Sequence, residues 1–195
     1  MIAVLVVMDR DYVPPRQTLP MRTPGIFQYA YFVDDLARAA ADWARTTGAG
    51  PFFLSAHHRA DAFEYRGTTN EADVSYSYAY AGDSQIQLIE QHDDQPSIYR
   101  DMFASGSFGH HHVAHLVPDY AGARQRLLDE GFEIACELRA NDITACYFDT
   151  RSATGCFTEL HSHTERIVAT FARWKAAHDG WDGTGDALRI HLSGT

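Results

Sequence analysis

The pattern of apolar and polar positions predicts an α+β fold that begins near residue 26. Residues 26–33 are mostly aromatic or β-branched, which is typical of a strand. Asp34 and Asp35 then supply an N-cap for an amphipathic helix that ends near Gly48. Strand-like segments follow around residues 52–54, 62–65, 74–80 and 85–90. The first half of the chain therefore predicts the order β-α-β-β-β.

The same order recurs in the second half of the chain. The strand and cap from His112 to Asp119 align without a gap with those from Gln28 to Asp35. A second helix closes at Gly131, and strands are predicted at 132–138, 143–148 and 156–160. The copies also end alike, with Glu90-Gln91-His92 in one and Glu159-Leu160-His161 in the other. We therefore expect two tandem βαβββ modules.

The repeat divides the chain into five predicted segments. A strand and a proline-rich arm precede the repeat, a linker joins its copies, and a helix with a tail follows it. The final helix carries Ile167, Phe171 and Trp174 on one face, so we expect it to dock on the core. The expected boundaries are 1–25 for the arm, 26–92 for the first module, 93–109 for the linker, 110–162 for the second module and 163–195 for the helix and tail.

Composition narrows the class of protein. The formal net charge is −10 and no run of lysine and arginine is present, which argues against nucleic acid as a partner. No segment approaches the roughly 20 apolar residues of a membrane helix, and the apolar start lacks the basic leader of a signal peptide. We expect no membrane partner and a cytoplasmic location. The cysteines Cys136, Cys146 and Cys156 form no CxxC pair and are expected to be reduced and buried.

Four polar residues occupy matched places in the two modules. Gln28 and His112 lie in the first strands, and Glu90 and Glu159 end the last strands. Because side chains alternate along a strand, the residues that share a face with each of them are mostly apolar. Each could have a purely structural role, as a hydrogen-bonded glutamine or an exposed strand end. Taken jointly they favour a metal site, since a buried charge is costly unless it is paired or coordinates a metal.

With these residues in place, the chain resembles the vicinal oxygen chelate superfamily over about residues 26–162. This superfamily includes glyoxalase I, methylmalonyl-CoA epimerase, extradiol dioxygenases and bleomycin-resistance proteins. The resemblance implies a curved mixed sheet around a cleft, with a divalent metal (Zn, Ni, Mn, Co or Mg) held by Gln28, Glu90, His112 and Glu159. That ligand set is similar to one glyoxalase I class and departs from the His/Gln/His/Glu set of acyl-CoA epimerases.

The resemblance also implies an activity. We expect a metal-dependent lyase, isomerase or epimerase, acting on a small α-hydroxy carbonyl or acyl thioester through a metal-bound enediolate. Glu159 or Glu90 would carry the proton, and Glu159 is the favoured base. A homodimer is expected. One alternative is a non-catalytic small-molecule binding protein of the bleomycin-resistance type. An extradiol dioxygenase is less favoured, because Gln28 stands where its iron site needs a histidine.

Overall fold

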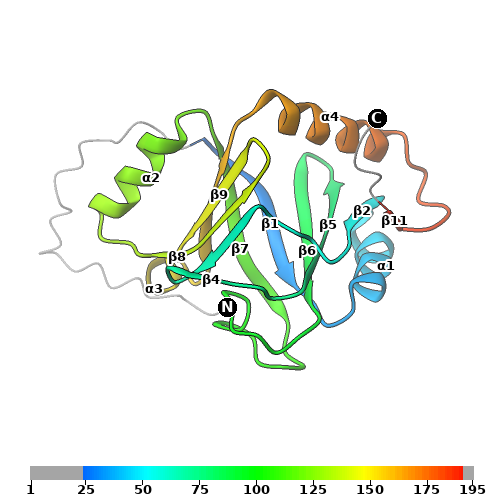
Figure 1. Cartoon of the computed structure of the whole chain (residues 1–195). Coiled ribbons are helices and arrows are strands. Elements are labelled where there is room, and N and C mark those ends of the chain that lie inside the picture. The colour runs from blue at the N-terminus through cyan, green and yellow to red at the C-terminus, as the bar shows by residue number, and fades with distance from the viewer. Residues whose placement is uncertain (1–23, 191–195) are drawn as a thin grey trace, which may run out of the picture.

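The computed structural model describes residues 24–190, and in this part of the chain one mixed sheet organises the fold (Figure 1). The predicted N-terminal strand lies outside the described residues. The elements are β1 (Ile26–Phe32), α1 (Leu36–Thr47), β2 (Phe52–Ser55), β3 (Ala62–Tyr65), β4 (Thr68–Thr69), β5 (Val74–Ala81), β6 (Ser84–Gln91), β7 (Gly109–Val117), α2 (Tyr120–Asp129), β8 (Ile134–Ala140), β9 (Ile143–Phe148), α3 (Arg151–Thr154), β10 (Phe157–Ser162), α4 (Glu165–Asp179) and β11 (Leu188–Ile190).

The two repeats lie side by side in this sheet and meet at its centre. The strand order is β11-β2-β5-β6-β1-β7-β10-β9-β8-β3-β4, with β1 antiparallel to β7. Within each repeat the first strand pairs in parallel with the last, β1 with β6 and β7 with β10. The predicted α+β architecture of tandem repeats in a mixed sheet is therefore confirmed.

Local sequence signals account for the two helices on the outer face of the sheet. The Asp35 side chain accepts the backbone N–H of Arg38 at 2.8 Å, and Asp119 accepts that of Gly122 at 2.9 Å. Gly48 ends α1 in the left-handed region, with φ 74°, as glycine does most readily. Apolar residues of α1 and α2 then cover the outer face of the first and second repeat respectively.

The inner, concave face of the sheet is covered in two places. At one end, the segment between the repeats packs Ile98 and Tyr99 against Phe32 and Phe157. At the other end, α4 lies across the sheet and contacts strands of both repeats (Figure 1). The prediction that the final helix docks on the core is confirmed. The middle of the inner face lies between these two covers.

A hairpin from the first repeat extends the sheet of the second. Strands β3 and β4 leave the first repeat, and β3 pairs with β8. Arg66, beside this hairpin, makes ion pairs with Asp101 at 2.6 Å and with Asp149 at 3.1 Å. The two repeats are therefore joined at the edge of the cleft as well as at the central β1–β7 pair.

Two further expectations concern helices and cysteines. Within residues 24–190, no helix is both long and apolar enough to cross a membrane. Cys136, Cys146 and Cys156 are free and buried, as predicted.

Candidate functional site

The centre of the inner face carries polar side chains in a symmetric arrangement. Gln28 of β1 lies opposite Ala114 of β7, and His112 of β7 lies opposite Ala30 of β1. Since Gln28 and His112 are equivalent in the sequence repeat, this crossed pairing is what an approximate twofold axis between the strands produces. Ala30 and Ala114 are fully buried, and their small side chains leave room between the polar groups.

The outer neighbours of these strands complete the arrangement. In β6, Gln87 pairs with Ala30, and in β10 Glu159 pairs with Ala114. Gln87 is therefore the counterpart of Glu159 in the first repeat. Gln28, Gln87 and Glu159 are all buried and line one cavity. Gln87 was not among the residues predicted for the site, although it alternates with Gln85 and Ile89 along β6, which places it on the same face.

Glu90 lies on the other face of the sheet, which corrects the expectation that it joins the metal site and shares the proton transfer. It alternates with Ile86 and Leu88, which pack against α1. Its Oε2 accepts the backbone N–H of Leu36 at 3.0 Å, and its Oε1 lies 3.5 Å from Nδ1 of His92. A carboxylate at this place stabilises the N-terminus of α1.

The amide nitrogens of Gln28 and Gln87 are both occupied by hydrogen bonds. Nε2 of Gln28 donates to Oε1 of Gln85 at 2.5 Å, and Nε2 of Gln87 donates to the Tyr78 hydroxyl at 3.2 Å. Oε1 of Gln87 is buried and has no hydrogen-bond partner in the described part of the chain. The hydrogen bonds of the two amides therefore leave carbonyl oxygens as the groups available to a ligand or cation.

His112 and Glu159 form the ionisable half of the site. His112 Nε2 lies 3.0 Å from Glu159 Oε2, and both side chains are almost fully buried. The contact does not meet hydrogen-bond geometry, so among residues 24–190 this nitrogen has no hydrogen-bond partner. Burial lowers the pKa of His112 to about 3, and burial also raises the pKa of Glu159. Each group is therefore disfavoured in its charged form while no cation lies between them.

A β-bulge in β7 fixes the protonation of His112. The register shifts between Ala30 and Tyr31, so that His111 is the extra residue of β7 and turns toward the inner side beside His112. His111 Nε2 donates to the carbonyl oxygen of Ile98 at 3.1 Å, and burial lowers the pKa of His111. Its unprotonated Nδ1 therefore accepts the Nδ1–H of His112, at 2.9 Å. Nε2 of His112 is therefore unprotonated, and its lone pair lies on the side of the ring that faces Glu159.

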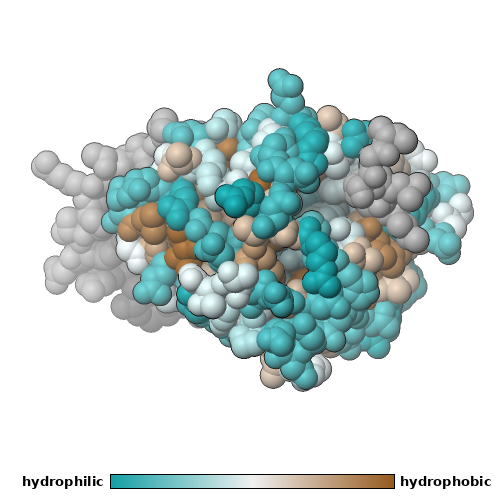
Figure 2. Space-filling view, viewed as in Figure 1, coloured by the Kyte–Doolittle hydropathy of each residue, from teal (hydrophilic) through white to brown (hydrophobic). Residues whose placement is uncertain are grey.

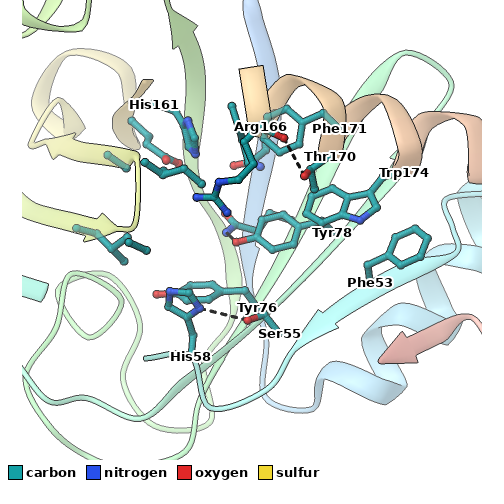
Figure 3. A pocket seen from close by; sticks show the side chains of 18 of the residues that line it. Phe53, Ser55, His58, Tyr76, Tyr78, His161, Arg166, Thr170, Phe171 and Trp174 are labelled. Carbon is teal, nitrogen blue, oxygen red and sulfur yellow. Dashed lines mark hydrogen bonds between the residues drawn. The ribbon is translucent and has the colours of Figure 1, made fainter. Parts of the chain in front are cut away.

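A cavity of about 190 Å³ lies above this floor. Tyr76, Tyr78 and Tyr147 form part of its walls, and His58 stands at one side beside Ser55 (Figure 3). Residues of α4, including Thr170 and Phe171, cover it. His112 does not line the cavity but lies directly behind Glu159. Figure 2 shows a mostly hydrophilic face, on which hydrophobic residues are visible as separate patches at the left, the centre and the right of the view.

The donor set fits a divalent cation only when the amides are included. No three His, Cys, Asp or Glu side chains cluster as a metal site within residues 24–190. His112 and Glu159 supply one imidazole nitrogen and one carboxylate, and Gln28 and Gln87 add two carbonyl oxygens. The unpartnered Nε2 of His112 and Oε1 of Gln87 are buried acceptors of the kind that a cation satisfies.

Comparison with known proteins identifies a family relationship. The model of a family described as "Glyoxalase/Bleomycin resistance protein/Dioxygenase superfamily" matches residues 27–147, more than half of the chain. No curated protein shows significant sequence similarity.

Solved structures show the same fold at low sequence identity. Methylmalonyl-CoA epimerase from Mycobacterium tuberculosis matches with a TM-score of 0.56 and 18% identity, covering 76% of this chain and 96% of that protein. A hypothetical protein from Bacillus halodurans C-125 has a TM-score of 0.53 and 17% identity, with 74% and 97% covered. Streptomyces coelicolor methylmalonyl-CoA epimerase in complex with 2-nitronate-propionyl-CoA gives 0.53 and 18%, with 73% and 99% covered.

Proposed function

This chain belongs to the Glyoxalase/Bleomycin resistance protein/Dioxygenase superfamily, and we propose that it is a divalent-metal-dependent isomerase, epimerase or lyase. The reaction would begin with removal of a proton from the carbon beside a substrate carbonyl group. One observation carries the proposal: the unprotonated Nε2 of His112 lies 3.0 Å from the carboxylate of Glu159, and Glu159 lines the floor of a covered cavity.

The metal would be held by His112, Glu159, Gln28 and Gln87. One imidazole nitrogen with three oxygens suits Zn²⁺, Ni²⁺, Co²⁺ or Mn²⁺, and less so Mg²⁺, which prefers oxygen ligands alone. A bound ion of this kind supplies Lewis acidity that withdraws electrons from a carbonyl oxygen and makes the neighbouring C–H bond more acidic.

Glu159 is the group we assign to proton transfer. It lines the cavity, whereas His112 lies behind it, so Glu159 is the acidic residue that a substrate in the cavity would meet. Burial raises its pKa in the metal-free protein, and a bound cation would oppose this shift and keep Glu159 ionised, as a base requires. A hydrogen bond with Tyr147 opposes this shift and orients the carboxylate.

Two measurements on the full chain test this proposal. Elemental analysis after dialysis should find close to one divalent metal per chain. In D₂O, the loaded protein should exchange the methyl protons of pyruvate, which flank its carbonyl group, as followed by proton NMR. Glu159→Gln keeps the size of the side chain and should reduce the exchange rate by about 10²- to 10⁴-fold.

Glu90→Gln is the matched control, because it makes the same chemical change on the outer face of the sheet. This variant should retain both the metal and the exchange activity. Undiminished exchange in Glu159→Gln would remove the assigned role of Glu159. A protein that retains no metal and exchanges no protons would contradict the proposed function as a whole.

A second candidate function is non-catalytic binding of a small molecule. The observation that favours it is the aromatic character of the cavity, with only two strong metal ligands beneath it. Such a protein would bind an aromatic ligand equally well before and after treatment with EDTA. A fall in affinity on metal removal would favour the enzyme.

A further inference from the structure

Helix α4 is a roof over the cavity, and it lies outside the residues that match the family model. Its buried residues Ile167, Phe171 and Trp174 face the concave side of the sheet. The Trp174 ring stacks on Phe53 with a centroid distance of 5.8 Å and on Tyr78 with a distance of 4.9 Å. On the side of the second repeat, Leu116 and Ile143 pack against the same helix. The helix therefore spans the cleft from one repeat to the other.

Polar contacts fasten both ends of this roof. Near its start, the Arg166 guanidinium pairs with Asp142 in the β8–β9 turn, with Nε donating at 2.6 Å. Near its end, His178 donates from Nδ1 to the carbonyl oxygen of Gly50 at 2.7 Å and accepts the backbone N–H of Gly82 at 3.2 Å. The roof is thus attached to the second repeat at one end and to the first repeat at the other.

The space below the roof is small. Its volume of about 190 Å³ is below the ~300–1,000 Å³ of sites for drug-sized ligands. A coenzyme A thioester has to place its acyl group on the floor while its long pantetheine arm leaves the protein. Phe171 and Trp174 of the roof line this space and pack against strands of the sheet, so such an arm would have to pass around them.

The cavity has one acidic and one basic end. Glu159 lies on the floor, and Arg166 lies at the mouth, where Figure 3 shows its guanidinium group near His161 and Tyr78. This guanidinium also pairs with Asp142 in an exposed ion pair, which a substrate carboxylate would share or displace. Within residues 24–190, Arg166 is the only arginine or lysine that lines this cavity. Burial lowers the pKa of His58, so that side chain is neutral at pH 7. The remaining lining is largely aromatic or aliphatic.

We infer that α4 restricts this site to small carbonyl compounds that carry a carboxylate, which Arg166 binds at the mouth, and that it excludes coenzyme A thioesters. The inference rests on the proposed function for the floor, where the carbonyl group would lie. The roof and the small volume support the exclusion of thioesters, and the Arg166 guanidinium supports the binding of a carboxylate. The aromatic and aliphatic walls would suit a substrate whose middle part is apolar or aromatic.

Calorimetric titration of the full chain with three probes tests the inference. Phenylpyruvate carries a ring, a carbonyl group and a carboxylate; phenylacetone lacks the carboxylate; propionyl-CoA represents the thioesters. Wild-type protein should bind phenylpyruvate, bind phenylacetone at least about tenfold more weakly, and show no binding of propionyl-CoA. Arg166→Gln should weaken phenylpyruvate about tenfold and leave phenylacetone unchanged.

Arg173→Gln is the matched control, because Arg173 is exposed on the same helix and its loss makes the same change in charge. It should leave all three affinities within about twofold, as is usual for an exposed charge. Phe171→Ala should open the roof and allow measurable binding of propionyl-CoA. Thermal melts of each variant identify any loss of folding. If Phe171→Ala does not fold, Thr170→Phe serves instead and should block phenylpyruvate by filling the cavity.

Each titration is run on metal-free and metal-loaded protein, so that the two proposals fail separately. Propionyl-CoA binding as tightly as phenylpyruvate to wild-type protein would overturn the inference, even if the metal is retained. Equal effects of Arg166→Gln and Arg173→Gln would overturn the role of Arg166. Phenylpyruvate binding that depends on Arg166 in a protein without metal affinity would instead contradict the proposed function and support the inference.

Discussion

The two repeats place different chemistry at equivalent positions. The first contributes Gln28 and Gln87, whose amides are neutral at every pH, and the second contributes His112 and Glu159, which ionise. Strand pairing is the same in both, since each polar residue lies opposite one of the alanines Ala30 and Ala114. The two repeats therefore share the same strand geometry but place different side chains on it. In the proposed site, the first repeat would supply oxygen donors, and the second would supply the charge and the group that carries the proton.

The largest expected effect comes from giving the second repeat the chemistry of the first. His112→Gln replaces the imidazole by an amide, which is a much weaker ligand for transition metals. We expect divalent metal affinity, measured by calorimetry, to fall by at least about 100-fold, equivalent to about 2.7 kcal/mol. An unchanged affinity would show that the two repeats do not differ as metal donors.

The reverse exchange gives the first repeat the chemistry of the second. Gln87→Glu adds a carboxylate opposite Glu159, so affinity for a divalent cation should rise about tenfold. In metal-free protein the same change should lower the melting temperature, because a second buried carboxyl group has no counter-charge. Gln85→Glu, on the same strand, is the control. An equal gain from that variant would show that position 87 is not special.

Each repeat has a bulge just before its first polar residue, at Phe27 in the first and at His111 in the second, and only His111 carries ring nitrogens. Removal of His111 tests the tautomer of His112. His111→Phe removes the acceptor of the His112 Nδ1–H, and metal affinity should fall by about 10- to 100-fold. Nitrogen-15 NMR should show that His112 no longer holds its proton solely on Nδ1. His111→Gln offers an acceptor again and should restore part of both properties. A fixed tautomer in His111→Phe would contradict the assignment.

Acid should destabilise the metal-free protein through the second repeat. The pKa of His112 in the folded state is about 3, below the ~6.5 of an unfolded chain, so the unfolded state binds more protons between these values. The free energy of unfolding should fall as pH falls from about 6.5, by at most about 1.4 kcal/mol per pH unit for this residue. In urea unfolding, the free energy of unfolding should depend less steeply on pH in His112→Gln than in the wild-type protein. Equal pH dependence in the two proteins would exclude His112 as the source.

The smallest effect is expected at Glu90, on the outer face. Glu90→Gln removes the carboxylate that accepts the Leu36 N–H, which should lower stability by about 0.3–1 kcal/mol in thermal or urea unfolding. Metal affinity should not change. A loss of metal in this variant would return Glu90 to the site and overturn the register-based assignment of Gln87.

The sequence predicted the repeat, the helix caps and the inward phase of Gln28, His112 and Glu159, because each depends on local spacing. It misplaced Glu90, because the matching Glu-x-His endings of the two copies suggested an alignment three residues away from the actual strand register. Only pairing with Ala30 identifies Gln87, and pairing is a long-range property. The bulge at His111 depends on β1 in the same way. The proposed segment boundaries remain predictions.

The β3–β4 hairpin has a consequence for any attempt to separate the two copies. Because β3 takes its partner from the opposite copy, a gene cut between residues 92 and 110 would yield two fragments that each expose an unpaired edge. When mixed, such fragments should associate through the β3–β8 pair and the central β1–β7 pair. An ancestral single copy, by the same logic, would have needed a second molecule to complete its fold.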